Sequence, residues 1–184
     1  MEKETVPKLG RQDWLTIGLK TLVGSGIEAV RVEPLAKLLK VTRGSFYWHF
    51  KNRDDLLEAI LQEWEIRNTE SIIQEVEAVG TDPGNKLLNL FELAARDDDH
   101  LEKAVRIWGA HDARALAAIR RVDQRRLDYL QNLFLQLGFS KAEAKVRARI
   151  VYSVRLGWFM MESLTEERLT EVRLVYKMLT WFHN

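Results

Sequence analysis

The chain contains no cysteine, and this absence excludes several classes of site. A disulfide framework, a cysteine-ligated zinc site and a cysteine nucleophile all need a residue type that is missing, and the composition is typical of a reducing compartment. Only three prolines and ten glycines interrupt the sequence, and β-branched alternation is nearly absent. No run approaches the roughly 18 apolar residues that a membrane span needs. We therefore expect no membrane partner.

The chain also lacks a large excess of charge of either sign, because its net charge is only +1. The chain as a whole is therefore no polycation, and any role with nucleic acid must come from a local cluster of charge. With 46% hydrophobic and 30% charged residues, the chain can build a sizeable core. The first five residues are charged and have no apolar signal core, which predicts a cytoplasmic protein.

Apolar residues recur at spacings of three and four almost throughout, and this predicts an all-α fold of about nine helices. Residues 11–50 form three of them, at 12–24, at 32–39 and as a short third helix that begins after Thr42. A long fourth helix, capped by Asn52, extends to about residue 79, and five more follow. We expect two domains: a three-helix head at 11–50 and a helical body at 51–184, with the helix at 51–79 as the connector.

Five ring side chains follow one another along the third predicted helix. Residues four apart share a helix face, so Phe46 and Phe50 can both face the core. Tyr47, Trp48 and His49 are then directed toward the rim or the outside. A short helix that presents polar-tipped rings and cations to solvent indicates an anionic partner.

Local charge points to the same helix. Residues 31–53 hold six cations against the single anion Glu33, an excess of +5. Phosphate contact needs a local patch of this kind. The order of helix, helix, tight turn and short helix is that of a helix-turn-helix unit, whose last helix enters the major groove. The six cations are Arg31, Lys37, Lys40, Arg43, Lys51 and Arg53.

The segment 35–56 resembles the DNA-binding signature of the TetR/AcrR family of bacterial transcriptional regulators. The residues that carry the resemblance are Leu35-Ala36, Val41-Thr42, Gly44, Tyr47-Trp48-His49-Phe50 and Leu56. The resemblance implies that Thr42, Arg43 and Ser45 face base edges and nearby phosphates. The Arg43 fork suits guanine O6 and N7. Gly44 removes a side chain where the helix approaches the groove.

The resemblance also implies a second group of residues that bind phosphates and so fix the position of the protein on the DNA. Two positions depart from the family pattern. Lys40 stands where the family usually has glycine, and a left-handed backbone there costs on the order of 1 kcal/mol. Arg31 stands where the second helix often begins with Thr or Ser, so it can supply the phosphate contact instead. Trp48 either packs in the head or contacts DNA. The implied phosphate-binding residues are Tyr47, His49, Lys51 and Arg53.

A ligand cavity in the body is a further expectation, with an ordinary filled core as the alternative. Arg126 interrupts an apolar stripe together with Asp123, and it either forms an ion pair at this i, i+3 spacing or contacts a ligand. No spacing of a metal site is present, and we predict neither metal nor cofactor. The predicted ligand-binding residues are Phe91, Trp108, His111, Arg126, Trp158 and Met161.

The last two predicted helices carry more apolar residues than one stripe can hold. A helix that is apolar nearly all round is buried on several sides, and exposed apolar area on this scale indicates association. A two-fold homodimer also suits a protein that reads two half-sites, and the resemblance implies the same helices. The predicted interface residues are Val151, Val154, Gly157, Val172, Val175 and Leu179.

These expectations combine into a homodimeric repressor that a small, mostly apolar effector releases from double-stranded operator DNA. The release mechanism comes from the resemblance. No nucleophile with a positioned base and no phosphate loop is apparent, so no catalytic residue and no enzymatic activity are predicted. Two alternatives stay open. One is a helical enzyme, small-molecule-binding or lipid-binding protein without DNA function, and the other is a DNA-binding protein without a ligand.

Overall fold

The computed structural model describes residues 9–96, 100–161 and 165–181, without the side chains of 159–161 and 165. Within these ranges the chain is helical and has no strand, which confirms the all-α prediction. The helices, in chain order, are α1 (Arg11–Ser25), η1 (Ile27–Ala29), α2 (Val32–Leu38), α3 (Arg43–Phe46), α4 (Arg53–Glu65), η2 (Ile66–Glu70), α5 (Ser71–Ala78), α6 (Pro83–Arg96), α7 (His100–Gly109), α8 (Ala113–Gln136), α9 (Lys141–Met161) and α10 (Thr165–Thr180).

One long helix was expected at 51–79, and the structure interrupts it. A π-helical turn, η2, separates α4 from α5. Such turns insert extra backbone into an otherwise regular helix and occur frequently at functional sites. The N-terminus of α4 is capped as predicted, because the Asn52 Oδ1 atom accepts a hydrogen bond of 2.9 Å from the Asp55 N–H.

The chain forms two compact units, and they divide it elsewhere than the predicted boundary at residue 50. The head unit contains the chain up to Trp64 together with His100–Leu116, and the body unit contains 65–99 and 117–184. Two contacts explain the difference. The α4 residues Leu56 and Ile60 are fully buried among the head helices, and α7 packs against α1.

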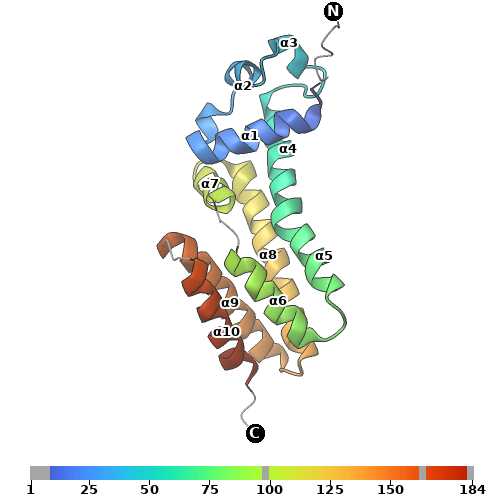
Figure 1. Ribbon diagram of the computed structural model, residues 1–184, viewed down its shortest axis with the longest axis vertical. Helices are drawn as coiled ribbons and strands as arrows, with labels where there is room; N and C mark the ends of the chain where they lie inside the picture. Colours follow the sequence, from blue (N-terminus) through green and yellow to red (C-terminus); the bar gives the residue numbers. More distant parts are fainter. Residues whose placement is uncertain (1–8, 97–99, 162–164, 182–184) are drawn as a thin grey trace, which may run out of the picture. The chain divides into compact units, whose positions relative to one another are not determined.

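Buried aromatic and aliphatic side chains from four helices form the core of the head unit. Figure 1 shows α1, α2 and α3 gathered around the beginning of α4. The approach of α1 to α4 is close at Gly18, where an added Cβ would lie 2.9 Å from the Ile60 Cδ1 atom. The largest buried side chains of this core are Trp14, Leu15, Leu22, Leu35, Phe46, Phe50, Leu56, Leu57, Ile60 and Trp64.

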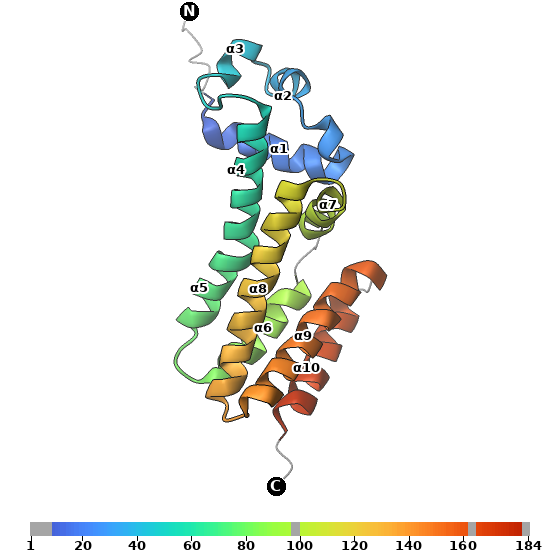
Figure 2. The same ribbon diagram turned by 180° about the vertical axis from the view of Figure 1, so that it is seen from behind.

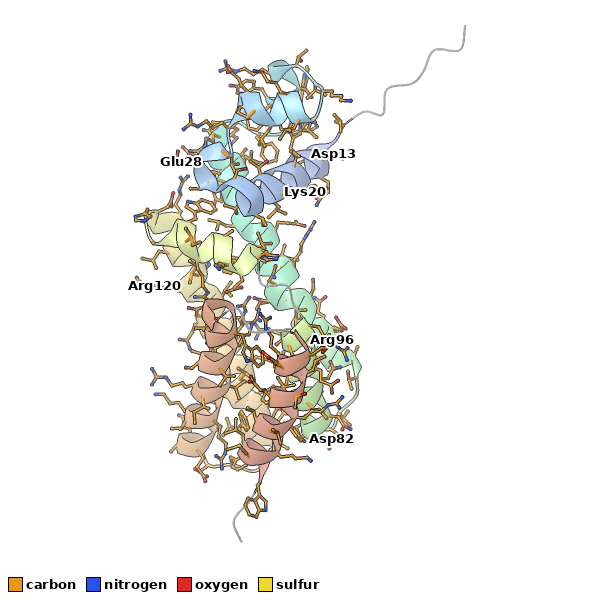
Figure 3. The ribbon with its side chains drawn as sticks, turned by 60° about the vertical axis from the view of Figure 1, so that its left-hand side comes forward. Asp13, Lys20, Glu28, Asp82, Arg96 and Arg120 are labelled. Atoms are coloured by element: carbon orange, nitrogen blue, oxygen red, sulfur yellow. The ribbon has the colours of Figure 1, made fainter. Side chains whose placement is uncertain are left out.

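The body unit has a core of its own, to which α5, α6, α8, α9 and α10 contribute. The helices α9 and α10 run side by side in both ribbon views (Figure 2). α6 packs against α10, and Arg173 donates to Glu92 across that contact at 3.2 Å. Asp82, labelled in Figure 3, caps α6 by accepting a hydrogen bond of 2.7 Å from the Asn85 N–H. In the described ranges, no helix has the length and apolarity that crossing a membrane requires.

Candidate nucleic-acid interface and body cavity

The turn before α3 is held by backbone hydrogen bonds that require a left-handed residue. The Val41 N–H donates to the Ala36 carbonyl at 3.0 Å, and the Lys40 N–H donates to the Lys37 carbonyl at 3.1 Å. This pair of bonds is a Schellman motif, which ends α2 after Leu39. Lys40 occupies its left-handed position with a φ of 56°. Lys40, which stands where the TetR/AcrR pattern usually has glycine, therefore has the backbone strain that was expected from its sequence position.

The inward face of α3 fixes the helix to the head unit. Phe46 and Phe50 are 0% and 2% exposed, and their rings stack with centroids 5.3 Å apart. Trp14 meets Phe46 edge-on at 5.2 Å. The i, i+4 spacing predicted this pair correctly, and its burial determines which residues of α3 remain outside.

The outward face of α3 and the turn after it is polar, aromatic and basic. Trp48 is 87% exposed and Tyr47 is 50% exposed, so Trp48 lies on the surface rather than in the core. Ser45 and His49 are half-buried. The other predicted DNA-binding residues that the structure exposes are Arg31, Thr42, Arg43, Gly44 and Lys51.

Arg43 lies at the start of α3 and is held by two neighbours. Its Nη1 donates to the Glu33 Oε1 atom at 3.1 Å, and its Nη2 donates to the Tyr47 hydroxyl at 3.3 Å. The Tyr47 hydroxyl and the Glu33 carboxylate raise the pKa of the Arg43 guanidinium, which therefore stays charged. Both partners are exposed, so a nucleic acid can replace them without burying an unpaired charge.

Arg53 has a different position from the one predicted. Its Nε donates to the Val30 carbonyl at 2.7 Å and its Nη2 to the Ile27 carbonyl at 3.0 Å. The half-buried guanidinium thus joins the start of α4 to the segment between α1 and α2. Its phosphate contact stays a prediction, while its hydrogen bonds within the head unit are structural. Arg31 is exposed and pairs with Glu28 at 3.4 Å.

Gly44 has no structural need to be glycine within this chain. It is exposed, and an added Cβ would meet only the Thr42 Oγ1 atom, at an ordinary distance of 3.7 Å. A glycine in a helix costs roughly 0.5–1 kcal/mol relative to alanine. Folding of this chain therefore does not explain the glycine, and the approach of a partner to α3 at this position stays a prediction.

A cavity of about 90 Å³ lies within the body unit, and η2, α5, α6, α8 and α9 contribute to its lining. Phe91, Arg126 and Trp158 line it, so the structure brings together three of the predicted ligand residues. The π-helical turn adds Asn68 and Thr69, which no pattern in the sequence indicated.

Arg126 donates hydrogen bonds to residues of η2 and α9 at this cavity. Its Nε donates to the Thr69 hydroxyl at 3.0 Å, its Nη2 to the Asn68 carbonyl at 3.0 Å and its Nη1 to the Tyr152 hydroxyl at 3.4 Å. The Tyr152 hydroxyl in turn donates to the Asp123 Oδ1 atom at 2.6 Å. Arg126 and Asp123 are thus connected through Tyr152, on the neighbouring helix α9.

The hydroxyl of Tyr129, another lining residue, is already engaged. It donates to the Glu77 Oε1 atom at 2.6 Å, while Lys86 contacts the other carboxylate oxygen. Burial and the Glu77 carboxylate raise the pKa of Tyr129 above its ordinary value, so its phenol stays neutral. Hydrogen bonds from Lys86 and Tyr129 lower the pKa of Glu77.

Three predicted ligand residues do not line this cavity as described. Trp108 and His111 belong to the head unit, where they border a separate hollow with α1 and η1. Trp108 also donates to Asp112, the residue that caps α8. The sequence could not separate the two groups, because apolar spacing does not indicate which helices meet. The Met161 side chain lies outside the described residues.

The predicted dimer residues are mostly turned inward. Val172 is 2% exposed, and Val151, Val154, Val175 and Leu179 pack against the body core. For Val172 the structure contradicts a surface contact, since its side chain is used inside the chain. An added Cβ at Gly157 would meet no other atom within 4 Å. The exposed apolar side chains of these helices are Val146, Ile150, Leu174 and Met178.

A metal site finds no support in the ranges that the structure describes. No group of three or more acidic, histidine or cysteine side chains is placed to hold an ion there. The chemistry available to the head surface is therefore hydrogen bonding and charge. At the cavity it is apolar contact with a guanidinium border.

The head segment is similar in sequence to known regulators. Residues 18–60 match the family model described as bacterial regulatory proteins, tetR family. Over 83 residues the chain is 34% identical to the HTH-type transcriptional regulator AcrR of Shigella flexneri, a match that covers 45% of this chain and 37% of that protein. It is 36% identical over 74 residues to the tetracycline repressor protein class G of Vibrio anguillarum, covering 38% and 34%. The matched part thus spans about a third of the length of these curated relatives.

The whole fold is similar to solved structures. The crystal structure of a TetR-family transcriptional regulator from Streptomyces coelicolor has a TM-score of 0.75 and 20% sequence identity, over 93% of this chain and 90% of that chain. At this identity the likeness concerns the fold alone. It extends over the helical body, which the family model at residues 18–60 does not reach.

Proposed function

We propose that this chain, whose residues 18–60 match the model of the TetR family of bacterial regulatory proteins, is a transcriptional repressor that binds double-stranded operator DNA as a homodimer. In this proposal the head unit binds the DNA and the body unit binds an effector and the second protomer. Effector binding lowers the affinity for the operator. The protein acts in the cytoplasm, with no catalytic step and no cofactor.

The outward face of α3 is the observation that carries the DNA-binding part. It combines an excess of +5 over residues 31–53 with an exposed Arg43 on α3 and an exposed Tyr47 and Trp48 in the turn after it. Cations at phosphates release counterions and supply sequence-independent affinity. The Arg43 guanidinium supplies the planar fork that reads guanine. Gly44 leaves room for the helix to approach the groove.

The body cavity supports the proposed binding of an effector, because residues of η2, the turn that interrupts the connector helix, line it. Asn68 and Thr69 belong to η2, the turn between α4 and α5, and both accept hydrogen bonds from Arg126. An effector that contacts Arg126 can therefore stabilise one conformation of η2 over another. A ligand shifts such an equilibrium only by its difference in affinity for the two states.

The exposed apolar residues of α9 and α10 support the homodimer. Ile150 and Leu174 are 45% and 57% exposed, and Met178 is 75% exposed. Apolar side chains on paired helices favour contact with a second copy, and two-fold pairing suits DNA half-sites. We therefore assign the interface to these residues rather than to the inward ones.

The test is operator binding by variants of the head surface. Arg43→Ala and Tyr47→Phe remove the proposed base contact and a proposed phosphate contact, so fluorescence anisotropy with the DNA upstream of the gene should show weaker specific binding. For Arg43→Ala the loss should be about 1–3 kcal/mol. Lys20→Ala, an exposed cation on α1 outside the segment, is the matched control. Unchanged specific binding by both variants, with an intact dimer, would refute the assignment.

A further inference from the structure

We propose that the DNA-binding surface continues beyond residues 31–53 onto the start of α1, where the guanidinium of Arg11 binds a phosphate of the DNA backbone. This adds a contact to the surface described above and therefore rests on the function proposed there. Arg11 lies outside residues 18–60, the segment that matches the family model. The position of its guanidinium, its exposure and its freedom from ion pairs each support the assignment.

The position of the Arg11 guanidinium is the first observation. It lies over the ring of Phe50, with the Cζ atom 4.9 Å from the ring centroid. Phe50 is 2% exposed and stacks on Phe46 of α3, so the ring that holds the guanidinium is itself fixed in the core. The neighbours of Phe50 along the chain are His49 and Lys51, two of the residues implied to bind phosphates. Arg11 therefore extends that group onto α1.

The charge of Arg11 is not used within the protein. The side chain is exposed, and within the described ranges its guanidinium contacts the Phe50 ring and no carboxylate or carbonyl acceptor. A cation over a ring face is attracted by the ring quadrupole, so the ring orients the guanidinium without neutralising it. The other arginines of the head unit have acceptors: Arg31, Arg43, Arg106 and Arg114 pair with carboxylates, and Arg53 donates to two backbone carbonyls.

The acidic residue two positions after Arg11 is engaged elsewhere. The Asp13 Oδ2 atom accepts a hydrogen bond of 2.7 Å from the Gly10 N–H, at the beginning of α1. A phosphate that reaches Arg11 therefore has no ion pair to displace. At Arg43, by contrast, DNA has to replace the Glu33 carboxylate.

A phosphate contact has a measurable signature that a base contact lacks. It supplies affinity and fixes the position of the protein on the duplex, but it carries no sequence information. Each neutralised phosphate of B-DNA contributes about 0.9 to the slope of log affinity against log salt concentration. A homodimer has two Arg11 side chains, so together they should contribute about 1.8.

Salt titrations of the full-length protein test the contact. Fluorescence anisotropy gives the affinity for the DNA upstream of the gene and for an unrelated duplex of equal length, at several salt concentrations. With Arg11→Gln the slope should be shallower by about 1.8, and by the same amount on both duplexes. Arg11→Lys keeps the charge and should retain the slope of the parent protein. An unchanged slope with Arg11→Gln would overturn the inference.

Lys20→Gln is the matched control, because it removes the same charge from an exposed position of the same helix. Figure 3 labels Asp13 in the first turn of α1 and Lys20 further along the helix. Lys20→Gln should leave the slope as it is in the parent protein. Equal changes with Lys20→Gln and Arg11→Gln would show a general effect of net charge and refute a local contact at Arg11.

Ethylation interference locates the contact on the DNA and separates the two proposals. Ethylation of at least one phosphate in each half-site should weaken binding of the parent protein but not of Arg11→Gln. If the parent protein binds the operator and both proteins give the same interference pattern, the Arg11 contact is refuted and the regulator stands. If the parent protein binds no DNA, the proposed function is refuted, and the Arg11 contact with it.

Discussion

Replacing Lys40 with glycine should stabilise the head unit, because Lys40 is left-handed in the Schellman motif that ends α2. A side chain in this backbone region costs roughly 1–2 kcal/mol. Glycine removes that cost but loses more conformational entropy on folding, by roughly 0.5–1 kcal/mol. The expected net gain is therefore about 0.5–1 kcal/mol.

Lys40→Ala is the matched control, since it removes the same charge and keeps the Cβ atom. The difference in unfolding free energy between the glycine and alanine variants isolates the backbone strain. This difference is measured by urea titration at constant pH and salt. The Tm of the glycine variant should exceed that of the alanine variant by roughly 2–4 °C per kcal/mol for a chain of this size. Both variants lose one cation of the basic segment, so both should bind DNA equally less well.

The chain has a second Schellman motif at the end of α8, with which the Lys40 motif can be compared. There the Phe139 N–H donates to the Phe134 carbonyl at 3.2 Å and the Gly138 N–H donates to the Leu135 carbonyl at 3.0 Å. The motif is the same, and its left-handed residue is a glycine with a φ of 94°. If Lys40→Gly proved no more stable than Lys40→Ala, Lys40 would not be left-handed in solution, and the strain argument would fail.

Two further predictions concern the same unit. Gly44→Ala should stabilise the protein by roughly 0.5–1 kcal/mol in thermal unfolding and yet weaken operator binding, and a variant that bound DNA as well as the parent would contradict the close approach of α3. Asp112→Asn should flatten the acid side of the stability curve. Burial raises the pKa of Asp112, but hydrogen bonds from Arg114 and Ala115 outweigh it and lower the pKa overall. The parent therefore keeps this stabilisation above the unfolded pKa of about 3.9 and loses it as pH falls further, whereas asparagine caps without titrating. Parallel urea midpoints for both proteins between pH 7 and pH 3 would count against this assignment.

Local sequence rules predicted the elements that depend on neighbours along the chain. The spacing of Phe46 and Phe50 gave their common burial, and Asn52 was recognised as a cap from its position before two acidic residues. Helix periodicity likewise located the long helices of the body. In each case the deciding interaction lies within about four residues, where sequence and space are directly related.

Features that depend on tertiary contact could not be predicted. Trp108 and Phe91 have equivalent apolar patterns, but one borders a hollow in the head unit and the other lines the body cavity. The interruption of the connector at η2 has no proline or glycine to indicate it. Val172 was selected because its helix is apolar on several faces, and periodicity cannot distinguish the face toward the core from the face toward a partner.

The head unit is built from two stretches of chain, and this limits how such a protein can be divided. A fragment that ends at Trp64 contains α1 to α4 but lacks α7, so the surface of α1 that α7 covers would be exposed to water. A chimera that exchanges DNA specificity therefore has to carry His100–Leu116 along with the N-terminal segment. In the vocabulary of protein engineering, the transferable module is discontinuous, although the residues proposed to contact DNA lie in one continuous stretch, its N-terminal part.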